Sequence, residues 1–148
     1  MIFDIDEQVR EAILGCTGVS ALVGNRCYPN NGEIDSILPY ITYLKISAIP
    51  DRSLNAGVLD SGMLRYQIDV WADSRAGANA ITNLILKTPT SGGINGFKGS
   101  FGTTNPVTVQ SCFVDSDIGV NDGQEYGNDD SLKSFYGSQF DLLIRVTG

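Results

Sequence analysis

The absence of histidine limits the chemistry that this chain can perform. Histidine is the commonest general base, metal ligand and proton shuttle near neutral pH. Without it, a serine or cysteine nucleophile needs a lysine partner, and no lysine stands at a recognisable spacing from one. The three cysteines, Cys16, Cys27 and Cys112, are far apart and odd in number, which argues against a disulfide framework or a clustered metal site. We therefore expect no catalytic group, no cofactor and no metal site.

Two segments resemble ligand-binding motifs in composition only. The glycine-rich residues 92–100 suggest a phosphate-binding loop, but Phe97 interrupts the required glycine–lysine order, and no strand precedes the segment. Asp115 and Asp117 match the first two ligand positions of a calcium loop, whereas Val120 stands where such a loop requires glycine. We interpret both segments as surface loops.

Length and charge restrict the class of protein. The chain has 148 residues, of which 42% are hydrophobic, and we expect a single domain over residues 1–148. The net charge of −7 argues against simple nucleic-acid binding, which needs clustered lysine and arginine. The charge is still compatible with a protein that DNA passes without binding, because an acidic surface repels the phosphate backbone. There is no apolar run long enough for a bilayer, and the acidic N-terminus is unlike a signal peptide, so we expect a protein made and kept in a cytoplasm, without a membrane partner.

The elements that would position any site begin with a strand and a helix in the middle of the chain. Residues 64–72 alternate between apolar and polar, which predicts a strand with one buried face and with Trp71 on the other face. Asp73 and Ser74 offer side-chain oxygens that can cap a following helix. Apolar residues spaced three or four apart predict that helix over residues 75–86.

The remaining periodicities complete a two-layer α+β fold. They predict a first helix over residues 5–15, capped by Asp4 or Asp6, a short helical turn over residues 19–23, an extended piece over residues 26–28, and strands over residues 40–49, 107–114 and 135–146. The principal order is α-β-β-α-β-β, from which we expect two helices on one face of a mainly antiparallel sheet of four or more strands. Long loops are expected at about residues 51–62, 90–105 and 115–134. The strand over residues 40–49 is apolar on both faces, so we expect helices to cover one face and a neighbouring chain the other.

The connection at residues 51–62 is the best candidate for an interaction site. A hairpin needs only about two to five connecting residues, yet this longer connection also carries apolar side chains. Apolar groups on a projecting loop are explained by burial against another subunit. We therefore predict a protein interface that includes Arg52, Leu54, Val58, Leu59 and Trp71. The alternative is that this connection folds back over its own sheet.

Three segments together resemble the tail completion (tail terminator) proteins of long-tailed bacteriophages. They are residues 22–29, residues 38–43, and residues 66–72 with the alanine-rich helix that follows; residues 140–144 look like the family's C-terminal strand. The resemblance implies a small α+β structural protein of the virion. It would assemble as a ring, typically hexameric, on the head-proximal end of the tail tube and stop tube polymerisation.

The same resemblance implies partners and a location. The partners would be further copies of the chain, the tail tube protein, and the neck or head completion proteins, with DNA passing through without specific binding. The protein would lie in the tail or neck of the virion after assembly in the host cytoplasm. Other readings are a different head–tail connector component, a small acidic dimeric ligand-binding module, or an enzyme using carboxylates such as Asp69 and Asp73. A native mass of about six chains, rather than one or two, separates the ring from the ligand-binding module.

Overall fold

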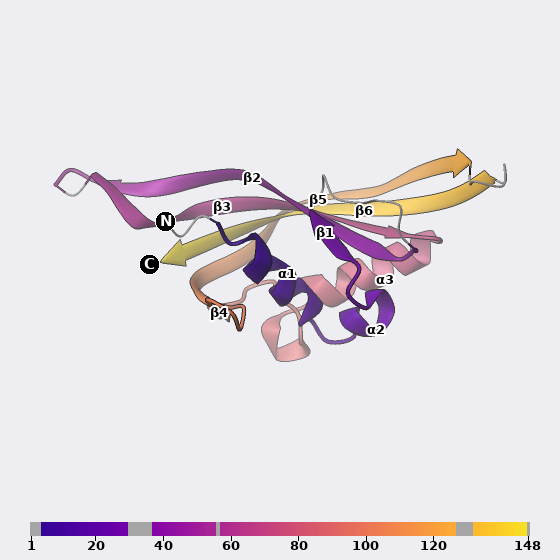
Figure 1. The fold of residues 1–148 in the computed structure, drawn as a ribbon, viewed down its shortest axis with the longest axis horizontal. Helices are drawn as coiled ribbons and strands as arrows, with labels where there is room; N and C mark the ends of the chain where they lie inside the picture. The colour runs from indigo at the N-terminus through magenta and orange to yellow at the C-terminus, as the bar shows by residue number, and fades with distance from the viewer. Residues whose placement is uncertain (1–3, 30–36, 56, 127–131, 148) are drawn as a thin grey trace.

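Three helices lie on one face of a curled six-stranded sheet (Figure 1). The computed structural model describes residues 4–29, 37–55, 57–126 and 132–147, and it describes their side chains except at residues 58–60, 116–126 and 132–135. The sheet order is β1-β2-β3-β6-β5-β4. In chain order the elements are α1 (Asp6–Leu14), α2 (Val19–Val23), β1 (Cys27–Pro29), β2 (Tyr40–Ser53), β3 (Gly57–Ala72), α3 (Arg75–Leu86), the 3-10 turn η1 (Pro89–Ser91), β4 (Gly99–Phe101), β5 (Val107–Tyr126) and β6 (Leu132–Thr147).

The α+β class is confirmed, but two details of the expected fold are wrong. The sheet is mixed rather than mainly antiparallel, because β1 runs parallel to β2. The pairings of β2 with β3, β3 with β6, β6 with β5 and β5 with β4 are antiparallel. The order α-β-β-α-β-β also omits the short elements α2, β1 and β4. The sequence does predict α2 and β1, as the helical turn over residues 19–23 and the extended piece over residues 26–28. It misses β4, which has three residues and is too short to give a clear hydrophobic period.

The strand β3 is the centre of the sheet, as its alternation predicts. Leu64, Tyr66, Ile68 and Val70 are fully buried, and they belong to the same hydrophobic core as the buried residues of the helices. In the neighbouring β6 the predicted alternation is also confirmed, with four buried side chains: Phe140, Leu142, Ile144 and Val146. Each of these core positions on β3 pairs with a β6 residue on the same face, which places two apolar rows side by side beneath α3.

The two principal helices begin in different ways. The helix α3 spans the predicted residues, and the hydroxyl of Ser74 accepts a 3.0 Å hydrogen bond from the amide of Gly77 as an N-cap. The expected acidic cap of α1 is wrong, because Ile5 is its N-cap residue and no side chain caps it. The carboxylate of Asp6 instead accepts a hydrogen bond from the hydroxyl of Tyr66.

Bulges change the faces of two strands. In β2 the register shifts between Lys45 and Ser47, so Ala48 packs against the core although Leu44 is exposed. The alternation of residues 40–49 predicts that Leu44 and Ala48 share a face, and this prediction is wrong because one extra residue exchanges the two faces of a strand.

The same effect occurs in β5, where the register shifts between Val109 and Ser111. Val109 and Cys112 are buried, whereas Phe113 is about half exposed. The alternation of residues 107–114 predicts that Phe113 shares a face with Val109. This prediction is wrong because the extra residue at the bulge exchanges the two faces of the strand.

Two of the three expected loops are largely strand. Over residues 51–62, β2 and β3 continue to pair, with Arg52 opposite Val58 and Ser53 opposite Gly57. Within residues 115–134, β5 and β6 pair as far as Tyr126 opposite Leu132. Such exposed ribbons consist largely of polar and glycine residues, so they lack the apolar alternation that predicts a strand. The third segment, residues 90–105, contains part of η1 and all of β4.

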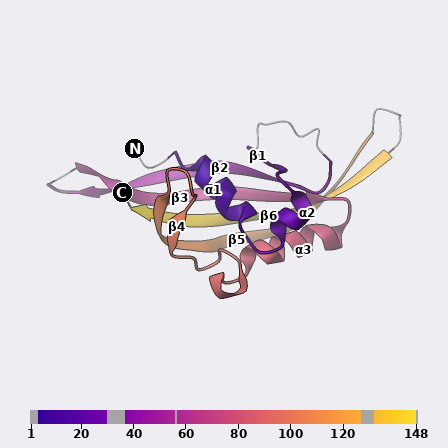
Figure 2. The same ribbon diagram turned by 60° about the horizontal axis from the view of Figure 1, so that its bottom comes forward.

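The two ribbons project from opposite ends of the sheet (Figure 1). The β2–β3 arm comprises residues 51–61, which lie beyond the pairing of β3 with β6. The β5–β6 arm comprises residues 123–126 and 132–135, which lie beyond that pairing at the other end. Figure 2 shows the helices gathered in front of the central part of the sheet, with the arms outside them.

Candidate interaction site

The predicted interface residues form two separate patches on the structure. Arg52 and Leu54 are exposed at the end of the β2–β3 arm, and Leu54 is 105% exposed. Val58 lies opposite Arg52 in this arm, but the side chains of Val58 and Leu59 are outside the described part of the chain. Trp71 lies at the other end of β3, roughly 40 Å away if the strand is extended. The arm and Trp71 therefore do not share one contact patch.

The base of the β2–β3 arm is held by Asp51. Its Oδ2 atom accepts a 2.8 Å hydrogen bond from Ser61 on the opposite strand, and it also lies 2.8 Å from Nη1 of Arg145 on β6. Both charged side chains are about one-third exposed, so this ion pair contributes little free energy of unfolding. Its effect is geometric, because it joins three strands where the arm leaves the sheet.

Arg65 joins three strands on the face without helices. Its Nη2 atom lies 2.7 Å from Asp115 on β5, and its Nη1 atom lies 3.0 Å from Asp141 on β6. Hydrogen bonds to Asp115 and Asp141 raise the pKa of the Arg65 guanidinium further above its ordinary value. Alternation predicts that Arg65 is on the open face, but it gives no information about which carboxylates it meets.

Trp71 packs against its neighbouring strand. A Cβ atom at Gly137 would lie 2.6 Å from Cζ3 of Trp71, so glycine is needed there to accommodate the indole ring. Trp71 is partly buried, on the face opposite the core residues of β3. It presents the remainder of its ring on a surface that no described helix covers.

Asp69 does not form a catalytic pair. Burial raises the pKa of its carboxyl group, while the hydrogen bonds from Gln67 and Gln139 lower it. The Nε2 atom of Gln67 lies 3.1 Å from its Oδ2 atom. Asp73, which was considered with it, is exposed after the end of β3. The amides of Gln67 and Gln139 therefore hold the Asp69 carboxylate, and the negative charge of Asp141 adds to the rise in its pKa.

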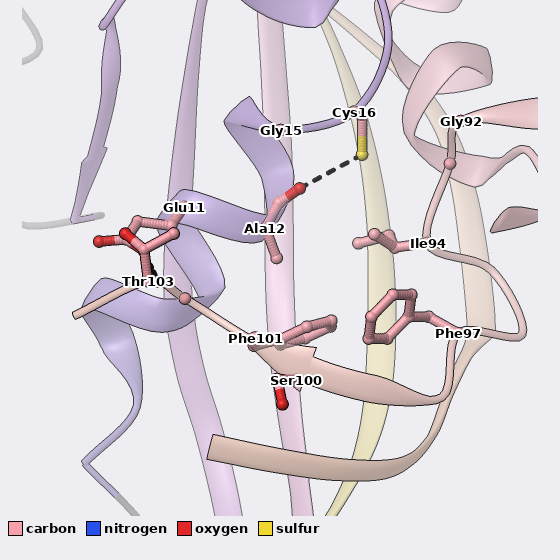
Figure 3. Close-up of a pocket in the computed structure, with 12 residues that line it drawn as sticks. Glu11, Ala12, Gly15, Cys16, Gly92, Ile94, Phe97, Ser100, Phe101 and Thr103 are labelled. Atoms are coloured by element: carbon pink, nitrogen blue, oxygen red, sulfur yellow. Dashed lines mark hydrogen bonds between the residues drawn. The ribbon is translucent and has the colours of Figure 1, made fainter. Parts of the chain in front are cut away.

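A cavity of about 280 Å³ lies between α1, β4 and the segment that follows η1 (Figure 3). The rings of Phe97 and Phe101 line it, with centroids 5.1 Å apart. The thiol of Cys16 donates a 3.4 Å hydrogen bond to the carbonyl of Ala12, and burial raises its pKa to about 11. A neutral thiol is a poor nucleophile, so the cavity offers a small apolar surface rather than a reactive group.

Close packing explains the glycines beside this cavity. A Cβ atom at Gly92 would lie 2.2 Å from the Thr17 hydroxyl oxygen, and Gly92 has a φ of +92°. A Cβ atom at Gly93 would lie 2.1 Å from the carbonyl oxygen of Lys87. The glycine-rich segment is therefore shaped to pack against the turn that follows α1 and against the end of α3. Among the described residues, no group of three or more cysteine, aspartate or glutamate side chains is placed to hold a metal ion.

These features define an α+β protein with two projecting arms and a sheet face that no described helix covers. The model of the family "Tail completion protein gp17" matches residues 7–88, which is more than half of the chain. The chain belongs to this family and is a structural protein of the bacteriophage virion, where it lies in the tail.

Other comparisons agree with the fold. A chain of the structure described as "Virion of native gene transfer agent (GTA) particle" is similar over 99% of both chains, with 13% identity and a TM-score of 0.58. No curated protein matches the chain in sequence. The family match extends from α1 to the end of α3 and so includes the β2–β3 arm, whereas the β5–β6 hairpin lies outside it. In the part of the chain that the structure describes, no helix combines the length and apolar character of a membrane span.

Proposed function

We propose that copies of this chain form a ring, hexameric as in the family it resembles, on the head-proximal end of the tail tube. The ring ends polymerisation of the tube and joins the tail to the neck proteins of the filled head. Membership of the tail completion family is the observation that carries this proposal. A role without catalysis follows from the chemistry of the chain, which has no histidine and whose three cysteines are buried.

The arms support assembly with other proteins. They extend from opposite ends of the sheet, so one subunit can contact neighbours on two sides (Figure 1). Leu54 at the end of one arm is fully exposed, and burial of such a side chain against a partner is favourable. We assign the assembly contacts to Arg52, Leu54, Val58, Leu59 and Trp71.

The charge of the chain supports passage of DNA without binding. The net charge is −7, which repels a phosphate backbone. Arg65 and Arg145 on the open face of the sheet are each held by aspartate, so these two described side chains have little free charge for phosphate contacts.

The mass of the native protein tests the ring, and purified tail tubes test its position. We expect a mass of about six chains, rings in negative-stain images, and a cap on one end of each tube. Capped tubes should not elongate when tube protein is added. A mass of one or two chains at every concentration contradicts the ring and favours a ligand-binding module. Rings that bind isolated heads but leave tubes free to elongate indicate a different connector component.

A further inference from the structure

One edge of the sheet is a long apolar strand. β1 lies against β2 only from Ile41 to Tyr43, and no further described strand lies along this edge of β2. Beyond that point Leu44, Ile46 and Ile49 are 39%, 47% and 65% exposed. Uncovered apolar edges promote uncontrolled pairing between chains, so native proteins cover or interrupt them.

The opposite edge is also largely open. β4 pairs with β5 only from Val107 to Val109. The loop before β4 contacts the next part of the edge, where Gly96 donates to the carbonyl of Cys112 and the side chain of Asn95 accepts from the amide of Val114. No described strand lies along β5 after this point. Figure 2 shows β2 and β5 toward opposite sides of the sheet.

The directions of the two edge strands are compatible with each other. Three antiparallel pairings separate β2 from β5, so these strands run in opposite directions. A second copy in the same orientation would therefore present its β5 antiparallel to β2, which is the more stable form of pairing. Such a contact joins two different surfaces. Its repetition gives a closed ring if the rotation that relates neighbouring copies divides evenly into a full turn.

The charges of the edge strands distinguish this contact from a symmetric one. β2 carries two basic residues, Lys45 and Arg52, and one acidic residue, Asp51, which already pairs with Arg145. β5 has no basic residue and has four acidic ones: Asp115, which already pairs with Arg65, and Asp117, Asp122 and Glu125. Contacts of β2 with β2, or of β5 with β5, bring like charges together, whereas β2 with β5 brings opposite charges together.

The open stretches also lie at opposite ends of their strands. The free part of β2 leads into the β2–β3 arm, whereas the free part of β5 leads into the β5–β6 arm. The free part of β5 in a neighbouring copy can therefore pair with the free part of β2 only if that copy is shifted along the direction of the strands. Strands that are tilted relative to a ring axis produce such a shift, as in closed barrels with tilts of about 35–45°.

We propose that residues 44–49 of β2 in one copy pair with residues 115–126 of β5 in the next copy, so that the sheets continue from subunit to subunit. This inference rests on the proposed ring and names the surfaces that build it. Pro50 and the two register shifts in β2 confine the pairing to a short stretch and prevent indiscriminate edge association.

Reversal of charge tests the pairing of opposite strands. Lys45→Glu with Arg52→Glu should weaken ring assembly by about tenfold or more. Asp117→Lys with Glu125→Lys should do the same, and all four changes in one chain should restore the rings. Lys87→Glu with Asn79→Asp and Asn83→Asp changes the charge by the same amount at exposed positions on α3 and just after it, away from both edges, and this control should assemble normally. Failure of the four changes to restore assembly, in chains with unchanged melting temperature, overturns the pairing.

Cysteine cross-linking distinguishes this inference from the ring itself. The native cysteines are buried, so cysteines introduced at positions 45–47 or 117–121 report on the edges. A disulfide forms only where Cα atoms approach to within about 7 Å. We expect cross-links in mixtures of a β2-edge variant with a β5-edge variant, and none in either variant alone.

The other outcomes separate the two proposals. Cross-linking within one variant alone shows a symmetric contact and overturns this inference. Intact rings without cross-links at any tested pair show that other surfaces build the ring, which overturns the pairing and leaves the proposed function standing. A wild-type protein that stays monomeric overturns both.

Discussion

The hydroxyl of Tyr66 donates a 2.5 Å hydrogen bond to the carboxylate of Asp6. It joins the centre of β3 to the first turn of α1, although the two residues are 60 positions apart in the chain. Tyr66 is fully buried, whereas Asp6 is exposed. The bond therefore satisfies a polar group in the core with an acceptor that water also reaches.

Removal of the Asp6 carboxylate should lower the free energy of unfolding more than removal of the Tyr66 hydroxyl. Asp6→Ala leaves the buried hydroxyl of Tyr66 without its partner and should lower the free energy of unfolding by about 1–3 kcal/mol. Tyr66→Phe leaves Asp6 hydrated and should cost about 1 kcal/mol. Urea unfolding of both variants and of the double variant measures these values. A double variant less stable than Asp6→Ala alone would contradict the explanation.

Alkaline pH should destabilise the fold. Burial, followed by the hydrogen bond to Asp6, raises the pKa of Tyr66, and burial raises the pKa of Cys27 and of Cys112 to about 12 from an ordinary value of 9.0. Since these pKa values are higher in the folded state, the stability they contribute is complete below about pH 9 and is lost as the pH rises toward 12. Melting temperatures measured from pH 8 to 12 should fall, and Cys112→Ala should make the slope shallower. A constant melting temperature over this range would show that the pKa values of these groups are not raised in the folded state.

Ile68→Ala should destabilise the core strongly. Ile68 is fully buried on β3 beneath the helix layer, and truncation of such a side chain leaves a cavity. The expected loss is about 2–5 kcal/mol in the free energy of unfolding, measured with urea. Asn83→Ala, at an exposed position of α3, is the matched control and should change stability by less than about 0.5 kcal/mol.

Trp71→Ala should weaken assembly more than it weakens the fold. Part of the ring contacts Gly137, and the remainder faces the uncovered side of the sheet. Native mass measures assembly, and urea unfolding of the separated monomer measures stability. A loss of monomer stability as large as that of Ile68→Ala, with rings intact, would show that Trp71 is a core residue instead.

The end of the β2–β3 arm should be dispensable for folding. Leu54→Ser, Val58→Ser and Leu59→Ser in one chain should leave the melting temperature nearly unchanged and abolish rings and tube capping. Leu22→Ser with Ile37→Ser removes exposed apolar side chains elsewhere and serves as the control. A large loss of monomer stability, with ring formation retained, would show that the arm packs on its own sheet.

The sequence predicts the regular parts of the fold and misses its interruptions. Alternation in β3 and β6 and the Ser74 cap of α3 are visible because each depends on neighbouring residues. The bulges at Lys45 and Val109 are set by pairing with strands distant in sequence, so a local period does not reveal them.

The interaction site shows the same limit. Apolar residues in a polar segment identified Leu54, whose exposure agrees with a contact residue. The sequence places Ile49 in a strand that is apolar on both faces but does not reveal that this strand has an open edge, because edge position depends on strand order. The ion pairs of Arg65 depend on β5 and β6, which lie far from β3 in the chain.

The pairing of Leu64 with Ile144 has a consequence for how the chain folds. The hairpins β2–β3 and β5–β6 each join strands close in sequence, and such hairpins form in about 1–10 μs. The β3–β6 junction closes a much longer loop, so we expect docking of the two hairpins to limit the rate of folding, at milliseconds to seconds. Until they dock, both hairpins expose the apolar faces that later form the core, and association between chains competes with folding. The yield of refolded protein should therefore fall as the chain concentration during refolding rises, while the observed folding rate stays constant.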